Sequence, residues 1–263
     1  MTSPILVTGG TGTLGRHVVR RLRDAANNVR VLSRRSHEAE DGIQFMSGDL
    51  ATGEGIEAAV DGIETIVHLA GSAKGDEDKA RNLVRAASSQ TMLPHLVYIS
   101  VVGADCIPMV SRVDRAMLGY FESKRAAEKA VEDSGLPWTT LRATQFYDLM
   151  LTVARQLAKL PVSPVPAGFR IQPGEADEVA ARLVELTLGE PAGMVPDMGG
   201  PRVYGAAELL RGYLRASKRR RRPIVPVWLP GKAARVFRDG GNLAPEQAVG
   251  HRTWEEFLAD RVS

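Results

Sequence analysis

A stretch near the start of the chain decides its fold: Ile5-Leu6-Val7-Thr8-Gly9-Gly10-Thr11-Gly12-Thr13-Leu14-Gly15. The apolar run at residues 5–7 is typical of a strand that is buried on both faces of a parallel sheet. Glycines follow at positions 9, 10, 12 and 15, and Leu14, Val18 and Leu22 then recur at helical spacing. A strand, a glycine-rich turn and a helix in this order predict a dinucleotide-binding βαβ unit.

The glycines suit this role for a physical reason. A diphosphate needs backbone N–H groups that point at it, and a helix N-terminus supplies unpaired donors together with the positive end of the helix dipole. Glycine permits the tight turn and the close approach of the phosphates, and the last glycine lets the helix pack closely on the strand. The alternative, an ordinary strand–helix turn that is rich in glycine, is disfavoured because both flanks match.

The residues after the next expected strand, 29–33, indicate which dinucleotide is bound. In an NAD-binding unit, an acidic residue about twenty positions beyond the glycines accepts hydrogen bonds from the ribose. This chain has Ser33, Arg34 and Arg35 there, with no carboxylate before Glu38. A guanidinium matches a phosphate and would stack on adenine. The sequence therefore favours NADP(H) over NAD(H), the alternative being that the arginines are only solvated loop charges.

The rest of the chain predicts an α/β fold, a Rossmann-like doubly wound parallel sheet. Its first part is expected to be an NADP-binding domain (1–150), followed by a small substrate-binding region (151–263) packed on it in a single compact unit. Proline density rises in the second part, so its early connections are expected to be irregular. His68 lies inside an apolar run and is interpreted as a core histidine. Further strands are expected at 43–46, 65–71, 96–102, 138–142 and 224–227, and helices at 54–61, 76–91, 120–133, 177–188, 208–216 and in the tail, anchored by Trp254, Phe257 and Leu258.

Composition excludes several classes of protein. The formal charge of +3 is too small to indicate a nucleic-acid partner, and the five successive cations at 218–222 are interpreted as a solvated turn. The single cysteine, Cys106, cannot form an intramolecular disulfide and is typical of a reducing compartment. No apolar run approaches membrane-spanning length, and the N-terminus lacks the basic region of a secretory signal. We expect a cytoplasmic protein with a small-molecule substrate, no metal site and no membrane partner.

One expected helix carries residues that are suited to proton transfer. Tyr120 and Lys124 are four positions apart and share a helical face. An unassisted phenol has a pKa near 10, which is too high for ready proton exchange at neutral pH, and a neighbouring ammonium would lower it. We therefore expect an acid–base pair beside a nicotinamide ring. Alone, however, the pattern Y-x-x-x-K usually marks only a solvated helix face.

These motifs together resemble the atypical short-chain dehydrogenase/reductases, and most of all the NmrA-like NAD(P)H-binding oxidoreductases that are common in actinomycetes. The resemblance covers nearly the whole chain. It rests on residues 8–15, 33–35, 48–50, 134–146, 196–201, 242–245 and 253–258.

The resemblance also implies roles for single residues. Residues 49–50 would lie against the adenine, residues 69–71 would line the middle of the cofactor, and Ser100 would lie near the nicotinamide. Lys124 would bind the hydroxyls of the nicotinamide ribose, and Tyr120 would be the acid–base residue. The residues that we expect to bind the cofactor are Thr8, Gly9, Gly10, Thr11, Gly12, Thr13, Leu14, Gly15, Ser33, Arg34, Arg35, Asp49, Leu50, Leu69, Ala70, Gly71, Ser100, Lys124, Thr144, Gln145 and Phe146.

The last three of these residues, 144–146, would border both the nicotinamide and the substrate. Two other stretches of the chain depart from the family pattern. Val101 and Val102 stand where the superfamily's catalytic serine is expected, so an oxyanion would lack one donor. The segment 105–119 is longer than in this branch and could displace Tyr120 or form a lid.

The function that the resemblance implies is an NADPH-dependent reductase of a small, largely apolar carbonyl or quinone compound. Two alternatives stay open, because a fold does not decide function. One is a non-catalytic NADP(H)-binding redox sensor of NmrA type, and the other is an isomerase or epimerase that uses the bound cofactor transiently. A homodimer is compatible with each of them.

Overall fold

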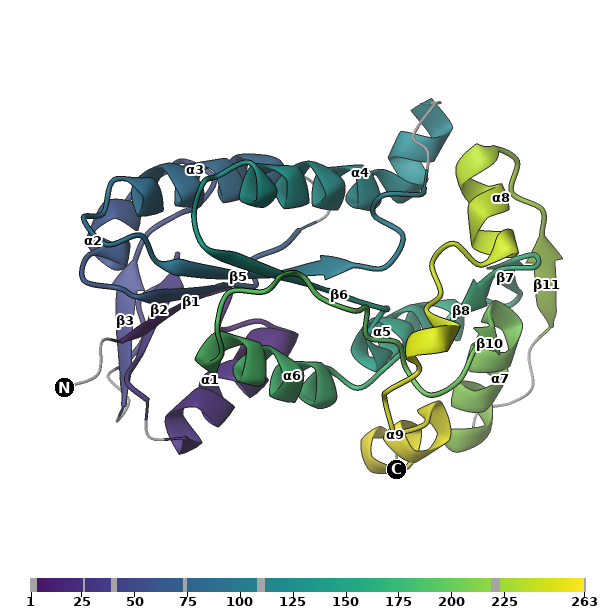
Figure 1. Cartoon of the computed structure of the whole chain (residues 1–263). Helices are drawn as coiled ribbons and strands as arrows, with labels where there is room; N and C mark the ends of the chain where they lie inside the picture. The colour runs from purple at the N-terminus through teal and green to yellow at the C-terminus, as the bar shows by residue number, and fades with distance from the viewer. Residues whose placement is uncertain are drawn as a thin grey trace. The chain divides into compact units, whose positions relative to one another are not determined.

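The protein is described by a computed structural model that covers residues 4–25, 27–38, 42–72, 75–107, 112–218 and 223–262 (Figure 1). The chain divides into two compact units, each assembled from three segments. We call them the sheet unit (Met1–Ser100, Tyr120–Arg142 and Val179–Pro196) and the second unit (Val101–Gly119, Ala143–Glu178 and Asp197–Ser263). The two units therefore interleave along the chain, whereas the sequence suggests a single boundary near residue 150.

The sheet unit is built on a seven-stranded parallel sheet with the order β3-β2-β1-β4-β5-β6-β9, which confirms the expected Rossmann-like α/β fold. The order reverses at β1, whose neighbours are β2 and β4, and ligands of doubly wound sheets bind beyond the carboxyl ends of the strands at such a point. The strands are β1 (Ile5–Thr8), β2 (Val29–Ser33), β3 (Ile43–Ser47), β4 (Thr65–His68), β5 (His95–Val101), β6 (Trp138–Ala143) and β9 (Gly193–Met194).

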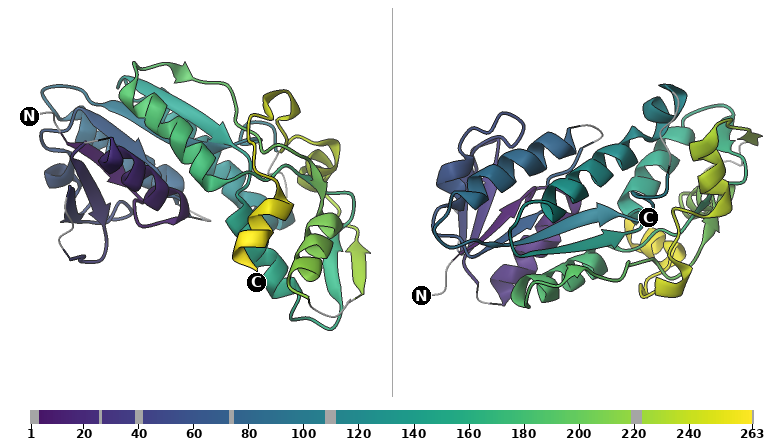
Figure 2. Two further views of the ribbon diagram at one scale, coloured as in Figure 1. Left: turned by 90° about the horizontal axis from the view of Figure 1, so that it is seen from below. Right: turned by 45° about the horizontal axis from the view of Figure 1, so that its top comes forward.

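Helices cover both faces of this sheet. In Figures 1 and 2, α1 and α6 lie on one face, and α2, α3 and α4 lie on the other. The expected apolar stripe of α1, Leu14, Val18 and Leu22, is buried. These helices are α1 (Thr13–Asp24), α2 (Ile56–Val60), α3 (Asp76–Ser88), α4 (Arg112–Glu132) and α6 (Ala176–Leu188).

Helix α4 begins at Arg112, earlier than the expected start at residue 120. The segment 105–119, which was expected as an insertion or lid, therefore contains the first turns of this helix. Residues 108–111 of that segment lie outside the described residues, so the expectation of a lid stays a prediction.

The second unit has its own core. Tyr147, Trp254 and Phe257 stack on one another, with ring centroids between 5.2 and 5.7 Å apart. Trp254, Phe257 and Leu258 are buried, which confirms the expected tail helix. The elements of this unit are α5 (Tyr147–Leu157), β7 (Ser163–Pro166), β8 (Arg170–Ile171), β10 (Tyr204–Gly205), α7 (Ala206–Ala216), β11 (Ile224–Val227), α8 (Lys232–Asp239), the 3-10 turn η1 (Pro245–Gln247) and α9 (Trp254–Arg261).

Helix α5 was not expected, because its residues were interpreted as an irregular connection. Tyr147 and Leu151 of α5 are buried, but Leu149 and Val153 are exposed. Apolar residues therefore occur on two faces of the helix, so the sequence lacks the single apolar stripe that predicts an amphipathic helix.

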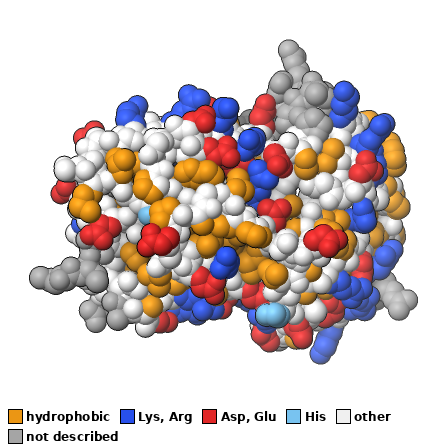
Figure 3. All heavy atoms as spheres, viewed as in Figure 1, with side chains coloured by type: hydrophobic (Ala, Val, Ile, Leu, Met, Phe, Trp, Pro, Cys, Tyr) orange, Lys and Arg blue, Asp and Glu red, His pale blue; other side chains and the backbone are white. Residues whose placement is uncertain are grey.

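The surface gives no sign of one dominant charge on the face drawn in Figure 3, where Lys and Arg side chains are interspersed with Asp and Glu. Of the cationic run at 218–222, only Lys218 is among the described residues. In the described part of the chain, no helix is long and apolar enough to cross a membrane. The same residues contain no group of three or more His, Cys, Asp or Glu side chains that is arranged to hold a metal ion.

Candidate functional site

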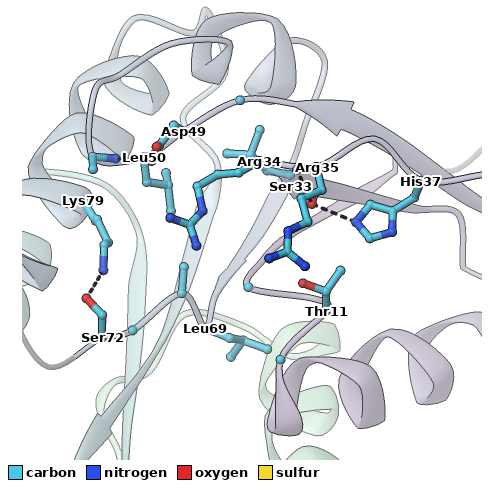
Figure 4. A pocket seen from close by; sticks show the side chains of 17 residues that line it. Thr11, Ser33, Arg34, Arg35, His37, Asp49, Leu50, Leu69, Ser72 and Lys79 are labelled. Atoms are coloured by element: carbon cyan, nitrogen blue, oxygen red, sulfur yellow. Dashed lines mark hydrogen bonds between the residues drawn. The ribbon is translucent and has the colours of Figure 1, made fainter.

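A pocket of about 670 Å³ opens where β1, β2, β3 and β4 end (Figure 4). Of the residues predicted to bind a cofactor, it is lined by Gly9, Thr11, Gly12, Ser33, Arg34, Arg35, Asp49, Leu50, Leu69, Ala70 and Gly71. It is also lined by residues that sequence reasoning missed, namely Leu32, His37, Gly48, Ala51, Ser72 and Lys79. The fold thus brings together four segments that are far apart in the chain.

The glycine turn packs closely against the backbone that follows β4. Gly9 has φ +71°, and a Cβ there would lie 2.7 Å from the backbone nitrogen of Ala70. The turn is closed by the Gly12 N–H, which donates to the Gly9 carbonyl at 3.0 Å. Helix α1 starts directly afterwards, without a side-chain cap and without an acidic residue in its first turn. These features suit an anion such as a diphosphate, because the first N–H groups of the helix have no intrahelical partner.

Other predicted loop residues support the turn without lining the pocket. A Cβ at Gly15 would lie only 2.1 Å from the Gly9 carbonyl oxygen, so α1 packs on the turn only with glycine here. Gly10 is packed against Val31 in the same way, with 2.9 Å available. Leu14 is buried in the core, and Thr13 is exposed outside the pocket.

Thr8 is also structural. It is buried, and the parallel register of β1 and β4 places it beside His68. Its Oγ1 lies 2.7 Å from His68 Nδ1, and the His68 ring stacks on Tyr98. Burial, assisted by the charge of Lys124, lowers the pKa of His68 to about 3. His68 therefore lies in the core as expected, but its Nε2 has no hydrogen-bond partner among the described residues.

One end of the pocket presents two cations. Arg34 and Arg35 are exposed, and Figure 4 shows both guanidinium groups turned into the pocket. No carboxylate in the described part of the chain pairs with either of them. Asp49 lines the facing wall, where its Oδ1 accepts the Ala51 N–H at 2.9 Å, and Leu50 beside it is buried. This end could hold an anionic group next to an apolar surface.

The other end of the pocket adjoins a buried ionic network. Asp76 at the start of α3 is 1% exposed, and its Oδ1 accepts the Ser72 N–H at 2.8 Å and the Lys79 ammonium at 3.1 Å. Its Oδ2 lies 3.4 Å from the Lys124 ammonium. Ser72 and Lys79, which also contact each other, line the pocket. Asp76 and Lys79 have no distinguishing signal in the sequence, because the charged run at the start of this helix is typical of a solvated face.

Lys124 and Tyr120 lie close together, as their spacing predicts. The Lys124 ammonium lies 5.8 Å from the centre of the Tyr120 ring. Lys124 is buried, and it donates to the Ile99 carbonyl at 3.2 Å and to the Tyr98 hydroxyl at 3.3 Å. It therefore reaches from α4 to the end of β5.

The expectation that Lys124 lowers the pKa of Tyr120 is wrong. Tyr120 is 38% exposed, yet the desolvation of its hydroxyl, and secondly the negative charge of Asp76, raise its pKa above the ordinary value. The shift therefore has the sign of desolvation and of a nearby carboxylate, which is opposite to the expected sign. Burial also lowers the pKa of Lys124, while Asp76 acts against that shift. Tyr120 thus keeps its proton at neutral pH.

The remaining predicted residues lie outside this pocket. Ser100 is buried at the end of β5, and its Oγ has no hydrogen-bond partner in the described part of the chain. Thr144, Gln145 and Phe146 belong to the second unit, so their part in the site stays a prediction. There the Thr144 hydroxyl accepts the Gly200 N–H at 3.2 Å, and Phe146 immediately precedes α5.

Comparison with known proteins agrees with this geometry. Residues 9–183 match a protein family that is described as NAD(P)H-binding. A (4-alkanoyl-5-oxo-2,5-dihydrofuran-3-yl)methyl phosphate reductase of Streptomyces griseus is 30% identical over 57% of this chain and 50% of its own length. An NAD(P)H azoreductase of Xenophilus azovorans is 25% identical over 82% of this chain and 74% of its own length. The chain thus spans half of the first relative and about three quarters of the second.

Solved structures share the fold. An NADPH-dependent quinone oxidoreductase of Escherichia coli in complex with NADPH has a TM-score of 0.81 at 19% identity, over 98% of this chain and 100% of its own. A UDP-glucose 4-epimerase of Thermus thermophilus in complex with NAD has a TM-score of 0.75 at 21% identity, over 98% of each chain. The expected kinship with atypical, NmrA-like short-chain dehydrogenase/reductases is confirmed, and the chain belongs to the NAD(P)H-binding family of oxidoreductases.

Proposed function

We propose that this protein is an NADPH-dependent reductase of a small, largely apolar carbonyl or quinone compound. The observation that carries the proposal is the pair of guanidinium groups of Arg34 and Arg35. They face the pocket beyond β2 and pair with no carboxylate among the described residues. A 2′-phosphate supplies the charge that this end of the pocket lacks, whereas the hydroxyls of NAD(H) do not.

The other parts of the pocket would bind the rest of the dinucleotide. The first N–H groups of α1 and the Gly9–Gly12 turn would hold the diphosphate, and Leu50 would cover the adenine. Lys124 would orient the nicotinamide ribose from its buried position. Bound NADPH would supply a hydride to the substrate.

Tyr120 would supply the proton. A phenol is protonated at neutral pH with its ordinary pKa as well as with a raised one, so Tyr120 would enter the reaction as a hydrogen-bond donor and acid. A carbonyl oxygen gains negative charge as hydride reaches its carbon, and a proton donor stabilises that charge.

The relatives support the class of substrate. The names of three of them specify reduction of a furanone phosphate, an azo compound and a quinone, all of which are small conjugated acceptors. A conjugated carbonyl or quinone is therefore the class to test first. We also propose a cytoplasmic location and leave a homodimer as a prediction, which light scattering of the purified protein would check.

The test is turnover by the purified full chain. NADPH consumption is followed with a panel of quinones, aldehydes and enones, beside NADH at equal concentration. We expect NADPH to be consumed with at least one quinone or enone, and faster than NADH. If NADPH binds tightly but is never consumed, the reductase proposal fails and the sensor alternative takes its place.

A further inference from the structure

A histidine that the proposed function does not use lines the pocket beside Arg34 and Arg35. His37 lies in the loop after β2, and its ring stacks on Phe45 of β3 with the centroids 4.6 Å apart. Its Nε2 lies 2.9 Å from the Ser33 Oγ (Figure 4). The aromatic contact holds the ring, and the hydrogen bond directs it at a serine that itself lines the pocket.

Ser33 Oγ is engaged from a second side. It accepts the backbone N–H of Arg35 at 3.2 Å. A hydroxyl has two acceptor positions and one proton to donate. If His37 also donates through Nε2, both acceptor positions of Ser33 are filled, and its own proton is left for an acceptor in the pocket. If Nε2 instead accepts, the Ser33 proton points at His37 and away from the pocket.

The protonation state of His37 therefore decides what Ser33 offers to a ligand. An imidazolium carries protons on both ring nitrogens and donates through Nε2 without exception, whereas the neutral ring does so in only one of its two tautomers. The imidazolium also adds a positive charge beside the two guanidinium groups. Histidine is the side chain that ordinarily changes charge between about pH 5 and 8.

We infer that His37 and Ser33 complete the 2′-phosphate site of NADPH, with His37 as a positioning residue that strengthens NADPH binding when it is protonated. This inference rests on the proposed NADPH use. Its consequence is that the affinity for NADPH, but not the affinity for NADH, rises as pH falls through the range in which histidine takes up its proton. The protein would then bind NADPH with uptake of a proton by the ring.

The charged groups around His37 agree with a role that depends on a ligand. Arg34 and Arg35 are on the same loop, Glu38 follows directly in the chain, and Asp49 lies across the pocket. From β3, the contact is with the uncharged ring of Phe45. A phosphate with about −1.5 to −2 charge among these cations would favour the protonated ring.

The experiment measures dissociation constants of NADPH and NADH for the full chain from about pH 6 to 8.5, the range in which histidine titrates. His37→Phe keeps a ring that can stack on Phe45 but has no N–H group. His37→Gln keeps a donor that does not titrate. His251→Gln is the matched control, because His251 is an exposed histidine of the second unit whose backbone N–H, rather than its ring, contacts Glu178.

We expect His37→Phe to weaken NADPH binding about 3- to 10-fold near pH 6 and less than about 3-fold near pH 8.5, since a hydrogen bond to a charged group is stronger than a neutral one. The phosphate titrates near pH 6 itself, but this effect is common to both proteins and cancels in the ratio of their constants. His37→Gln should show NADPH affinity near that of the wild type at the alkaline end. NADH binding, and the His251→Gln control, should match the wild type throughout.

Two results would overturn the inference, and they are distinguishable. If the wild type prefers NADPH but the ratio of wild type to His37→Phe is flat across pH, only the role of His37 fails. If the wild type binds NADPH and NADH equally, the proposed cofactor choice fails and the inference fails with it. Thermal melting of the apo-proteins identifies a variant that is merely misfolded. If His37→Phe is misfolded, His37→Gln tests the inference instead. Its NADPH affinity should then change less steeply with pH than that of the wild type, and an equal slope would overturn the role of His37.

Discussion

Arg34 and Lys124 are both cations of the sheet unit, yet the fold treats them in opposite ways. Arg34 is exposed, and no carboxylate of the described residues pairs with it. Lys124 is 3% exposed and is surrounded by Asp76, Tyr98 and the Ile99 carbonyl. An unpaired exposed cation interacts strongly with an anion that reaches it, whereas a buried and already paired cation changes little when a ligand arrives.

The difference separates two tasks. Discrimination between ligands requires a group whose interactions are incomplete until the correct ligand binds. Positioning requires a group whose geometry is already determined by its neighbours. The β2 end of the pocket is suited to the first task and the α3–α4 network to the second.

The largest loss of stability is expected when the buried ionic network around Asp76 is broken. Asp76→Asn removes the counter-charge of Lys124 and Lys79, and removal of one partner of a buried ion pair costs about 3–5 kcal/mol. We expect the free energy of unfolding in urea to fall by that amount. Asp76→Asn combined with Lys124→Met should recover part of it, because no buried unpaired charge is left.

The control for Asp76 is its neighbour in the same helix. Glu77→Gln breaks an exposed pair with Arg81, which contributes less than about 1 kcal/mol. If Asp76→Asn is as mild as Glu77→Gln, the network does not hold Lys124 as proposed, and the contrast with Arg34 disappears.

The next largest loss of stability is expected in the glycine turn, which lies between the two ends of the pocket. Gly15→Ala puts a methyl group 2.1 Å from the Gly9 carbonyl oxygen, so the turn or α1 must move, at an expected cost of about 2–4 kcal/mol. Gly119→Ala is the matched variant, because Gly119 is also a helical glycine, but outside its own helix no described atom lies within 4 Å of the added methyl group. It should stabilise the protein by about 0.5–1 kcal/mol. Urea unfolding of both variants checks this, and equal effects would refute the tight packing.

A smaller effect, on the affinity for NADPH, is expected at the end of the pocket that Arg34 and Arg35 form. Arg34→Ala should weaken NADPH binding roughly 10- to 100-fold and leave NADH binding nearly unchanged, because a hydrogen bond to a charged group contributes about 1.5–3 kcal/mol. Calorimetry with both nucleotides measures the two affinities. The same measurement on Arg35→Ala shows how much each guanidinium group contributes to NADPH binding. Equal losses for NADPH and NADH would exclude a phosphate at this position.

The smallest effect on stability concerns His68, the core histidine at the end of β4. The pKa of His68 is about 3 in the folded protein against about 6.5 when unfolded, so the unfolded chain alone takes up this proton between those values. Stability is therefore full above about pH 6.5 and falls as pH decreases, by at most about 1.4 kcal/mol per pH unit. We expect a loss of about 1–2 kcal/mol between about pH 7 and 5.

His68→Asn should flatten that part of the profile. Burial lowers the pKa of His95 as well, so a weaker slope of the same sign should remain. Urea unfolding at several pH values measures the slopes, with the exposed His251→Asn as the control. An unchanged slope in His68→Asn would show that His68 is protonated in the native state.

The sheet unit could be predicted from the sequence far better than the second unit. Strand β1 begins with a continuous apolar run and α1 has one apolar stripe, so local pattern and tertiary burial agree there. In the second unit, α5 has apolar residues on two faces and α8 is only eight residues long, so local pattern does not reveal them.

The same contrast holds inside the site. Glycines and arginines beyond a strand are visible in the sequence because their spacing follows from the chemistry of a dinucleotide. The burial of Asp76 has no such local signature, because it depends on Ser123 and Lys124 of α4, which lie far along the chain. The sign of the Tyr120 pKa shift could not be predicted for the same reason, since it depends first on desolvation of the hydroxyl and secondly on Asp76, and tertiary packing determines both.

Gly71 forms the wall of the pocket nearest to the buried network. A methyl group there would lie 3.1 Å from the Lys124 nitrogen and 3.2 Å from the Asp76 Oδ2. A side chain at this position would therefore press on both members of a buried ion pair at once. Glycine lets the backbone beyond β4 run beside the two opposite charges without displacing either, so the position that borders the pocket also preserves the pairing inside the fold.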